Sequence, residues 1–115
     1  MRKVIKIGEK EYSIKSSAYT IFKYKNDTGR DLLNDLKELS SLTSDNALEQ
    51  LTTLNDTLLR ITYVMILEAD NNQVEDYESW LKSIENVYGD VKWMSDSLEC
   101  AIAPFSGGIE TNSQV

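Results

Sequence analysis

Residues 47–69 have the sequence ALEQLTTLNDTLLRITYVMILEA, which carries the strongest periodic pattern in the chain. Side chains at helical spacing share one face: Leu48, Leu51, Leu54, Leu58, Ile61, Thr62 and Met65. Between Ile61 and Leu67 this apolar face widens until it surrounds the helix. Because a helix that is apolar all round must be covered by neighbours or by a partner, we predict a long central helix from about residue 47 to residue 69.

Two further helices are predicted on the C-terminal side. Asn72, with Glu75 three positions later, resembles a capping box. The helix that follows ends at Gly89, and its apolar stripe consists of Tyr77, Trp80, Leu81, Ile84, Val87 and Tyr88. Asp90 is expected to cap the last helix, which ends before Pro104. The buried face of that helix is predicted to be Val91, Met94, Leu98, Ala101 and Ile102.

The N-terminal side begins with a predicted β-hairpin. Apolar and polar residues alternate with a period of two, which gathers four side chains on one face: Ile5, Ile7, Tyr12 and Ile14. Gly8 is expected in the turn, because glycine adopts a positive φ without strain. A two-residue and a four-residue loop both keep the same side chains on the same face, so the register stays open.

Two helices are predicted between the hairpin and the central helix. Ser16 or Ser17 caps the first and Gly29 ends it. Its apolar stripe is expected to carry Ala18, Ile21, Phe22 and Lys25. Asp31 caps the second, whose apolar edge consists of Leu32, Leu33, Leu36 and Leu39. Residues 40–46 are predicted to form a polar joint.

The sequence therefore predicts a mainly α fold, in which an N-terminal β-hairpin packs on a bundle of about five helices. A chain of 115 residues is long enough to bury one hydrophobic core. We expect a single domain over residues 1–105. Residues 106–115 carry no core-forming pattern and are predicted to be a flexible C-terminal tail.

Charge is unevenly distributed along the chain. The net charge is −7, but residues 1–30 hold eight Lys/Arg and three Asp/Glu, giving +5, whereas residues 31–115 hold four and sixteen, giving −12. A basic head on an acidic body favours self-association of head with body, or a partner of mixed charge. The simpler alternative is that the acidic groups only keep the body in solution. Because the body would repel phosphates, we expect no nucleic-acid partner.

Hydropathy and cysteine usage limit the environment of the protein. The most apolar run, residues 61–67, is far shorter than the roughly 20 residues that cross a bilayer. The basic start at residues 1–3 is not followed by the apolar stretch of a signal peptide. The single cysteine, Cys100, excludes an internal disulfide and a cysteine-clustered zinc site. We therefore expect no membrane partner and a reducing, cytoplasmic location.

No catalytic signature is found in the sequence. The chain has no histidine, which removes the commonest general base and metal ligand and leaves Cys100 without an activating base. Acid pairs at helical or near-helical spacing, such as Asp31/Asp35 and Asp96/Glu99, are expected by chance in so acidic a body. Residues 70–72 lack the rest of a calcium-binding loop. We predict that the protein is not an enzyme and has no catalytic, metal or cofactor-binding residues.

Four aromatic side chains are candidates for binding a partner, because large rigid side chains dominate binding when exposed. Trp93 lies on the polar side of its helix, where it either contacts a partner or is covered by another helix or the hairpin. Tyr19 and Tyr24 lie off the apolar stripe of the first helix. Phe105 either packs the C-terminus onto the core or stays free to bind. Trp80, by contrast, lies inside its stripe and is expected in the core.

Three passages carry a resemblance to a known family. Residues 4–15, VIKIGEKEYSIK, form a strand–turn–strand opening, and residues 27–33, DTGRDLL, close an aromatic-bearing helix. A long apolar helix, an acidic turn and a Tyr/Trp-bearing helix precede residues 101–105, AIAPF, and a tail that contains glycine. Together these features resemble the tail assembly chaperones of long-tailed phages, the functional counterparts of the lambda G protein.

The resemblance implies a protein that acts in the host cytoplasm and is absent from the mature virion. Such a chaperone binds the tape measure protein, keeps it soluble and helps recruit tail tube subunits. In many members of that family a ribosomal frameshift appends a second domain that contacts the tube protein. Two alternatives stay open: a small acidic regulatory or inhibitor-type protein that binds one compact partner, and a minor structural tail component that stays in the particle.

Overall fold

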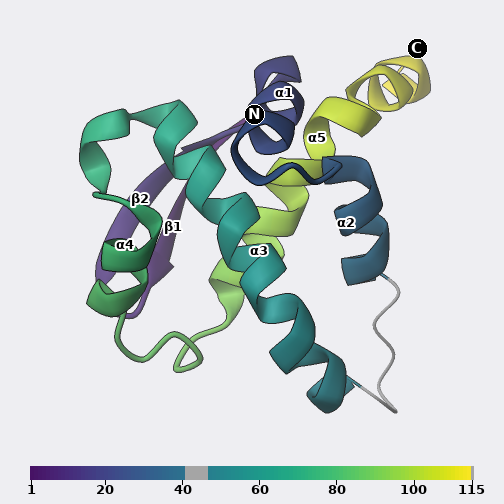
Figure 1. The fold of residues 1–115 in the computed structure, drawn as a ribbon. Coiled ribbons are helices and arrows are strands. Elements are labelled where there is room, and N and C mark those ends of the chain that lie inside the picture. The colour runs from purple at the N-terminus through teal and green to yellow at the C-terminus, as the bar shows by residue number, and fades with distance from the viewer. Residues whose placement is uncertain (41–46, 115) are drawn as a thin grey trace.

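A computed structural model gives the fold, a two-stranded hairpin followed by five α-helices (Figure 1). It describes the backbone of residues 1–40 and 47–114 and the side chains of residues 1–39 and 55–105. The elements are β1 (Arg2–Ile7), β2 (Lys10–Lys15), α1 (Ala18–Thr28), α2 (Leu32–Ser40), α3 (Ala47–Ala69), the 3₁₀ turn η1 (Asn71–Gln73), α4 (Tyr77–Ser83) and α5 (Lys92–Gln114). The predicted fold class is confirmed. Of the predicted polar joint, residues 41–46 lie outside the described residues.

The hairpin has the predicted inward face and a register that the sequence left open. Ile5, Ile7, Tyr12 and Ile14 are all buried. Ile7 pairs with Lys10, so the turn contains two residues, and Gly8 has a φ of +63°. Gly8 has a positive φ and Glu9 does not, so the turn is of type II′. The backbone twist of this turn type matches the right-handed twist of the two strands.

Replacing Gly8 by alanine is expected to lower the free energy of unfolding by about 2 kcal/mol. An L side chain is strained at this φ, and its Cβ would overlap the carbonyl oxygen of Glu85, which forces the hairpin tip and that segment apart. Gly29→Ala is the matched control, because φ is +75° there but no atom lies within 4 Å of an added Cβ. Urea denaturation measures both variants, and equal losses would contradict the close contact at Gly8.

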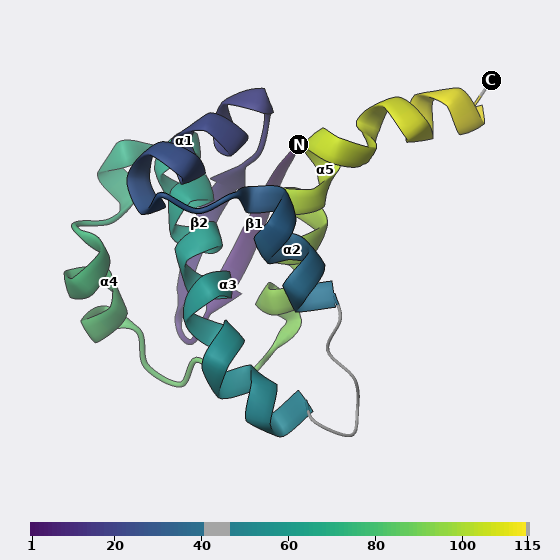
Figure 2. The same cartoon turned by 45° about the vertical axis from the view of Figure 1, so that its right-hand side comes forward.

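Helix α3 is central, as predicted. It contacts β2, α1, α2 and α5, and Ile61, Met65 and Ile66 are fully buried. In Figures 1 and 2 α4 lies on one side of α3 and α2 on the other. None of the helices in the described part of the chain has the length and hydropathy of a membrane span.

The predicted limits of α4 are wrong. Asp76, not Asn72, is the N-cap, and its carboxylate accepts hydrogen bonds from the backbone N–H and the hydroxyl of Ser79 (3.1 and 2.8 Å). The helix ends at Ser83 rather than Gly89, since Ile84 adopts an extended conformation. The carbonyl of Glu85 then lies against the hairpin tip. This tertiary contact outweighs the helical spacing that continues through Tyr88.

The predicted face and end of α5 are also largely wrong. Trp93, Ser97, Cys100 and Ala101 are buried, whereas Val91 is 52% and Ile102 is 40% exposed. Of the predicted buried face, Ala101 alone is buried, and Met94 and Leu98 are partly so. The helix continues through Pro104 to Gln114, although proline cannot donate a hydrogen bond to the carbonyl of Cys100. The flexibility of residues 106–115 stays a prediction.

Candidate protein-binding surface

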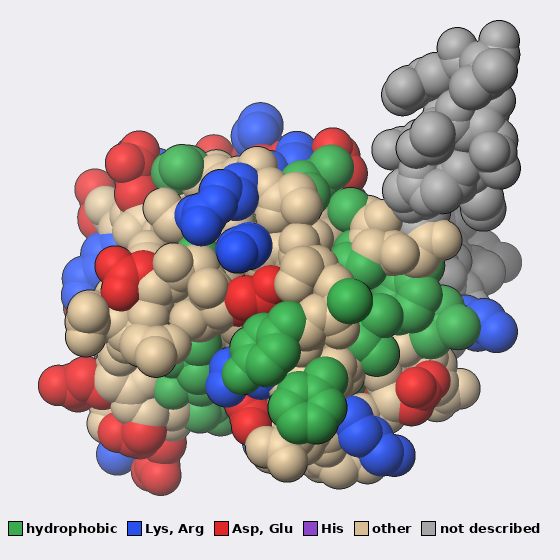
Figure 3. All heavy atoms as spheres, turned by 90° about the horizontal axis from the view of Figure 1, so that it is seen from above, with side chains coloured by type: hydrophobic (Ala, Val, Ile, Leu, Met, Phe, Trp, Pro, Cys, Tyr) green, Lys and Arg blue, Asp and Glu red, His purple; other side chains and the backbone are tan. Residues whose placement is uncertain are grey.

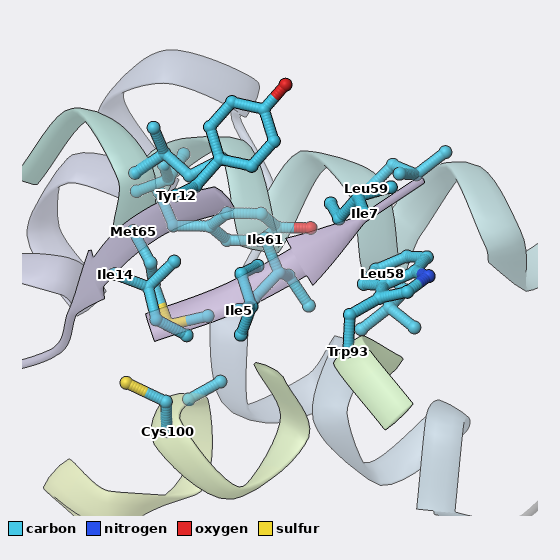
Figure 4. Close-up of a cluster of buried hydrophobic side chains, with 14 of the residues drawn as sticks. Ile5, Ile7, Tyr12, Ile14, Leu58, Leu59, Ile61, Met65, Trp93 and Cys100 are labelled. Atoms are coloured by element: carbon cyan, nitrogen blue, oxygen red, sulfur yellow. The ribbon is translucent and has the colours of Figure 1, made fainter. Parts of the chain in front are cut away.

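Trp93, a candidate for binding a partner, is a core residue, so of its two alternatives the covered one holds. Its side chain is 1% exposed, and its Nε1–H donates to the carbonyl oxygen of Val87 at 2.9 Å. Figure 4 shows Trp93 in the same buried cluster as Ile7, Leu58 and Leu59. The hairpin, α3 and the segment before α5 therefore supply the cover that the sequence left open as an alternative.

Tyr24, another candidate for binding a partner, is also buried, so its selection is wrong. Its hydroxyl donates to Oδ2 of Asp35 at 2.5 Å, and Arg30 donates to both oxygens of the same carboxylate at 2.7 and 2.8 Å. Burial, and then the hydrogen bond to Asp35, raises the pKa of Tyr24 well above its ordinary value. Burial alone would raise the pKa of Asp35, but the bonds from Arg30 and Tyr24 outweigh it and lower that pKa. The network joins α1 to α2.

A second polar anchor fixes the rotation of α1. Glu68, near the end of α3, accepts the hydroxyl of Ser17 at 2.6 Å and the hydroxyl of Thr20 at 2.5 Å. Ser17 and Thr20 also form the capping box of the helix. Thr20 and Tyr24 are thereby turned inward, and both are fully buried. Thr20 and Tyr24 thus form the buried face of the helix, and of the predicted apolar stripe only Ile21 packs against the core.

The opposite face of α1 exposes two aromatic side chains, Tyr19 and Phe22, which we call the aromatic pair. Tyr19 is 54% and Phe22 is 62% exposed, and their ring centroids lie 5.9 Å apart. The exposure of Tyr19 agrees with its selection as a candidate, whereas Phe22 was expected in the core and is not there. Figure 3 views the molecule from above, where α1 lies in Figure 1, and shows apolar side chains at the surface beside Lys and Arg.

Phe105, the fourth candidate, is partly buried and packs against the hydrophobic core. The sequence left two alternatives for Phe105, packing onto the core or remaining free to bind a partner. The structure shows the first of them. Its exposed area is therefore smaller than that of the aromatic pair, and it contributes less to a binding surface.

A polar cavity of about 360 Å³ lies between β2, η1 and α4. Its lining includes Lys10, Tyr12, Gln73, Glu75 and Trp80. Tyr12 and Trp80 meet edge to face at 6.2 Å, and the buried Nε1–H of Trp80 has no hydrogen-bond partner among the described residues. The cavity has donors and acceptors for a small polar group.

Reactive groups are few in the described part of the chain. There, no three Asp, Glu, Cys or His side chains are grouped so as to hold a metal ion. Cys100 is buried, and burial raises the pKa of its thiol, which keeps the thiol protonated and poorly nucleophilic. Chemically, the arrangement is suited to contacts with another polypeptide through the aromatic pair.

Comparisons with models of protein families, with curated proteins and with solved structures found no match to this chain. The case for a function therefore rests on the surface of the molecule and on the resemblance of its sequence.

Proposed function

We propose that this protein is a non-catalytic tail assembly chaperone that binds the tape measure protein through the aromatic pair on α1. The observation that carries the proposal is the exposure of Tyr19 and Phe22 side by side on a helix whose other face is tightly held. Exposed aromatic side chains that cluster are the residues that most often dominate binding energy at protein interfaces.

The attachment of α1 supports this role, because a rigid helix loses little conformational entropy when it binds. The helix is held at its start by the capping box and by Glu68, and near its end by the bond from Tyr24 to Asp35. The aromatic pair is thus presented by a fixed scaffold. A tape measure protein is long and helical, and apolar ridges on its helices are suitable partners for aromatic side chains.

Several copies of a small chaperone bind a long client more tightly together than a single copy does. A modest contact repeated along one long chain gives a stable assembly by avidity. The +5 head and the −12 body favour association of neighbouring copies. In the proposed role the protein acts in the host cytoplasm, helps recruit tail tube subunits and leaves before the virion matures.

The chemistry of the chain supports a non-catalytic role. The sequence has no histidine, and its single cysteine is buried with a raised pKa. A chaperone needs neither a general base nor a nucleophile, since its task is to cover apolar surface reversibly.

We expect the double variant Tyr19→Ala/Phe22→Ala to bind the tape measure protein at least about tenfold more weakly, because both residues of the aromatic pair are removed. The measurement is co-purification and titration with the tape measure protein encoded in the same phage genome. The melting temperature should stay close to that of the wild type, since neither side chain is buried.

Tyr88→Ala is the matched control, because Tyr88 is 48% exposed but lies between α4 and α5, away from α1 in sequence and in fold. Its binding should equal that of the wild type. Unchanged binding by the double variant, or an equal loss in Tyr88→Ala, would reject the aromatic pair as the client contact. A complex of one copy with one compact protein would favour the inhibitor-type alternative, and recovery of the protein from purified virions would favour the structural one.

A further inference from the structure

The two edges of the hairpin differ in how their backbone groups are satisfied. On the outer edge of β2, the side chain of Gln73 imitates a neighbouring strand. Its Oε1 accepts the N–H of Ser13 at 2.8 Å, and its Nε2 donates to the carbonyl oxygen of Ser13 at 3.0 Å. In Figure 1, α4 also lies on the β2 side of the hairpin. The outer edge of β2 is therefore blocked at Ser13.

The same bonds establish the orientation of β1. Because Gln73 is hydrogen-bonded to both the N–H and the C=O of Ser13, these two backbone groups point away from β1. Val4 lies opposite Ser13, and residues that face each other in an antiparallel pair point their backbone groups either both inward or both outward. Val4 therefore points its N–H and C=O outward, and so do Arg2 and Lys6, two positions away on either side.

The outer edge of β1 is open. Among the described residues, no hydrogen bond satisfies the outward backbone groups of Arg2, Val4 and Lys6. Val4 is 63% exposed, and Arg2 and Lys6 are exposed as well. A hollow of about 320 Å³ lined by Arg2, Lys3, Val4, Ser13 and Ile14 spans both strands of the hairpin. An added strand would find unpaired backbone groups along β1.

We propose that this edge binds an acidic, extended segment of a partner protein, which pairs with β1 through Val4 as an additional strand. Strand addition takes its affinity from main-chain hydrogen bonds and its specificity from the flanking side chains. Here the flanking side chains are Arg2 and Lys6, with Lys15 opposite Arg2 on the next strand. Carboxylates at alternate positions of the added strand would lie beside these cations.

The acidic groups near this edge do not cancel its charge. Glu11 lies opposite Lys6 and offsets one cation of the outer face. Asp96 and Glu99 on α5 are held by Lys3 at 3.6 and 3.1 Å. Asp96 also binds Lys92 at 2.7 Å. With Lys3 set aside, the hairpin, residues 1–15, keeps four Lys/Arg against two Asp/Glu.

A second copy of this chain is the less suitable occupant. If two β1 strands paired antiparallel about Val4, Arg2 of each copy would face Lys6 of the other. Like charges directly opposite are destabilising, and basic residues on an edge strand are a common means of preventing self-pairing. The site is separate from the aromatic pair, so it does not depend on the proposed chaperone function.

The experiment uses amide hydrogen exchange followed by NMR, with a synthetic peptide of alternating valine and glutamate as the probe. In the free protein we expect the amides of Val4 and Lys6 to exchange faster than those of Ile5 and Ile7, which point at β2. The peptide should slow exchange at Val4 and Lys6. A peptide of alternating valine and lysine should not, and added salt should weaken the effect.

Val4→Pro removes the outward N–H without removing a bond to β2, because proline is tolerated on the solvent side of an edge strand. We expect about tenfold weaker binding of the acidic peptide, since one bond is lost and a carbonyl of the peptide is left unpaired. Val4→Thr keeps the N–H and the β-branched shape, so it should bind within about twofold of the wild type.

Three results would overturn the proposal. The first is equal binding by the proline and threonine variants. The second is peptide-induced protection at Tyr19 and Phe22 instead of Val4 and Lys6. The third is protection of Val4 that rises with protein concentration in the absence of peptide, which would identify a second copy as the occupant. If Val4→Pro fails to fold, the exchange measurements on the wild-type protein still decide the question.

Discussion

Trp93→Ala is expected to lower the free energy of unfolding by about 4 kcal/mol, the cost of truncating a large buried aromatic side chain. The side chain is 1% exposed and lies among the residues of the main hydrophobic cluster. Its removal leaves a cavity at the junction of the hairpin, α3 and α5. It also leaves the carbonyl oxygen of Val87 without its hydrogen-bond donor. Urea denaturation followed by circular dichroism measures the loss.

Trp93→Phe is the control for this effect. It keeps most of the apolar volume but loses the bond from Nε1 to Val87, so we expect a loss of about 1–2 kcal/mol. Under conditions where Trp93→Ala is still folded, its affinity for the tape measure protein should match that of the wild type. A stable Trp93→Ala variant with weakened binding would restore Trp93 as a partner contact and contradict the packing described above.

Asp35→Ala is expected to lower the free energy of unfolding by about 3 kcal/mol, because it leaves the buried hydroxyl of Tyr24 without its acceptor. Asp35 is 1% exposed, whereas the side chain of Arg30 is 48% exposed and is partly resolvated when its partner is lost. Most of the cost therefore lies at Tyr24. Tyr24→Phe in the Asp35→Ala background tests this, since it removes the orphaned hydroxyl and should recover part of the loss.

The contribution of Asp35 to the free energy of unfolding decreases as the pH falls. Folding lowers its pKa below the ordinary value of 3.8, so the folded state favours the charged carboxylate. The stabilisation is present in full above pH 4 or so and is lost as the pH falls through the folded-state pKa. Asp56, Asp76 and Asp96 also have lowered pKa values, so the wild type loses stability in acid for several reasons.

Comparison with Asp35→Asn isolates the effect of Asp35. The variant should be less stable than the wild type at pH 7, and the difference should shrink between pH 4 and pH 2 as the wild-type carboxylate is protonated. Thermal unfolding across this range provides the measurement. A difference between the two proteins that stays constant down to pH 2 would show that the charge of Asp35 contributes nothing.

The sequence contains a signal for this network. Asp35 interrupts the leucine edge of α2, between Leu32 and Leu36, and an acid in such a position needs partners. Arg30 lies five residues before Asp35 and Lys37 two residues after it, so the sequence offers cationic partners on both sides. No comparable signal marked Glu68, because its two hydroxyl partners lie 51 and 48 residues away in the chain.

The candidate surface was predicted only in part. Tyr19 was selected because it lies off the apolar stripe, and it is exposed. Tyr24 and Trp93 were selected on the same grounds and are buried, while Phe22 was assigned to the stripe and is exposed. Helical spacing identifies residues that share a face, but it does not say which face turns inward when polar groups on the other face find buried partners.

The sequence by itself determined the features that depend on neighbouring residues. These are the alternation of the hairpin, the caps at Ser17, Gly29 and Asp31, and the extent of α3. Each is set by contacts within a few residues, so local physical chemistry suffices.

Only the tertiary structure decided the rotation of α1 and α5, the end of α4, and the blocking of one hairpin edge by Gln73. The physical reason is that each depends on a partner distant in sequence. Glu68 turns α1, the hairpin and α3 cover Trp93, and the hairpin tip meets Glu85. A local pattern cannot specify contacts of this kind, because their energy exists only once the chain is folded.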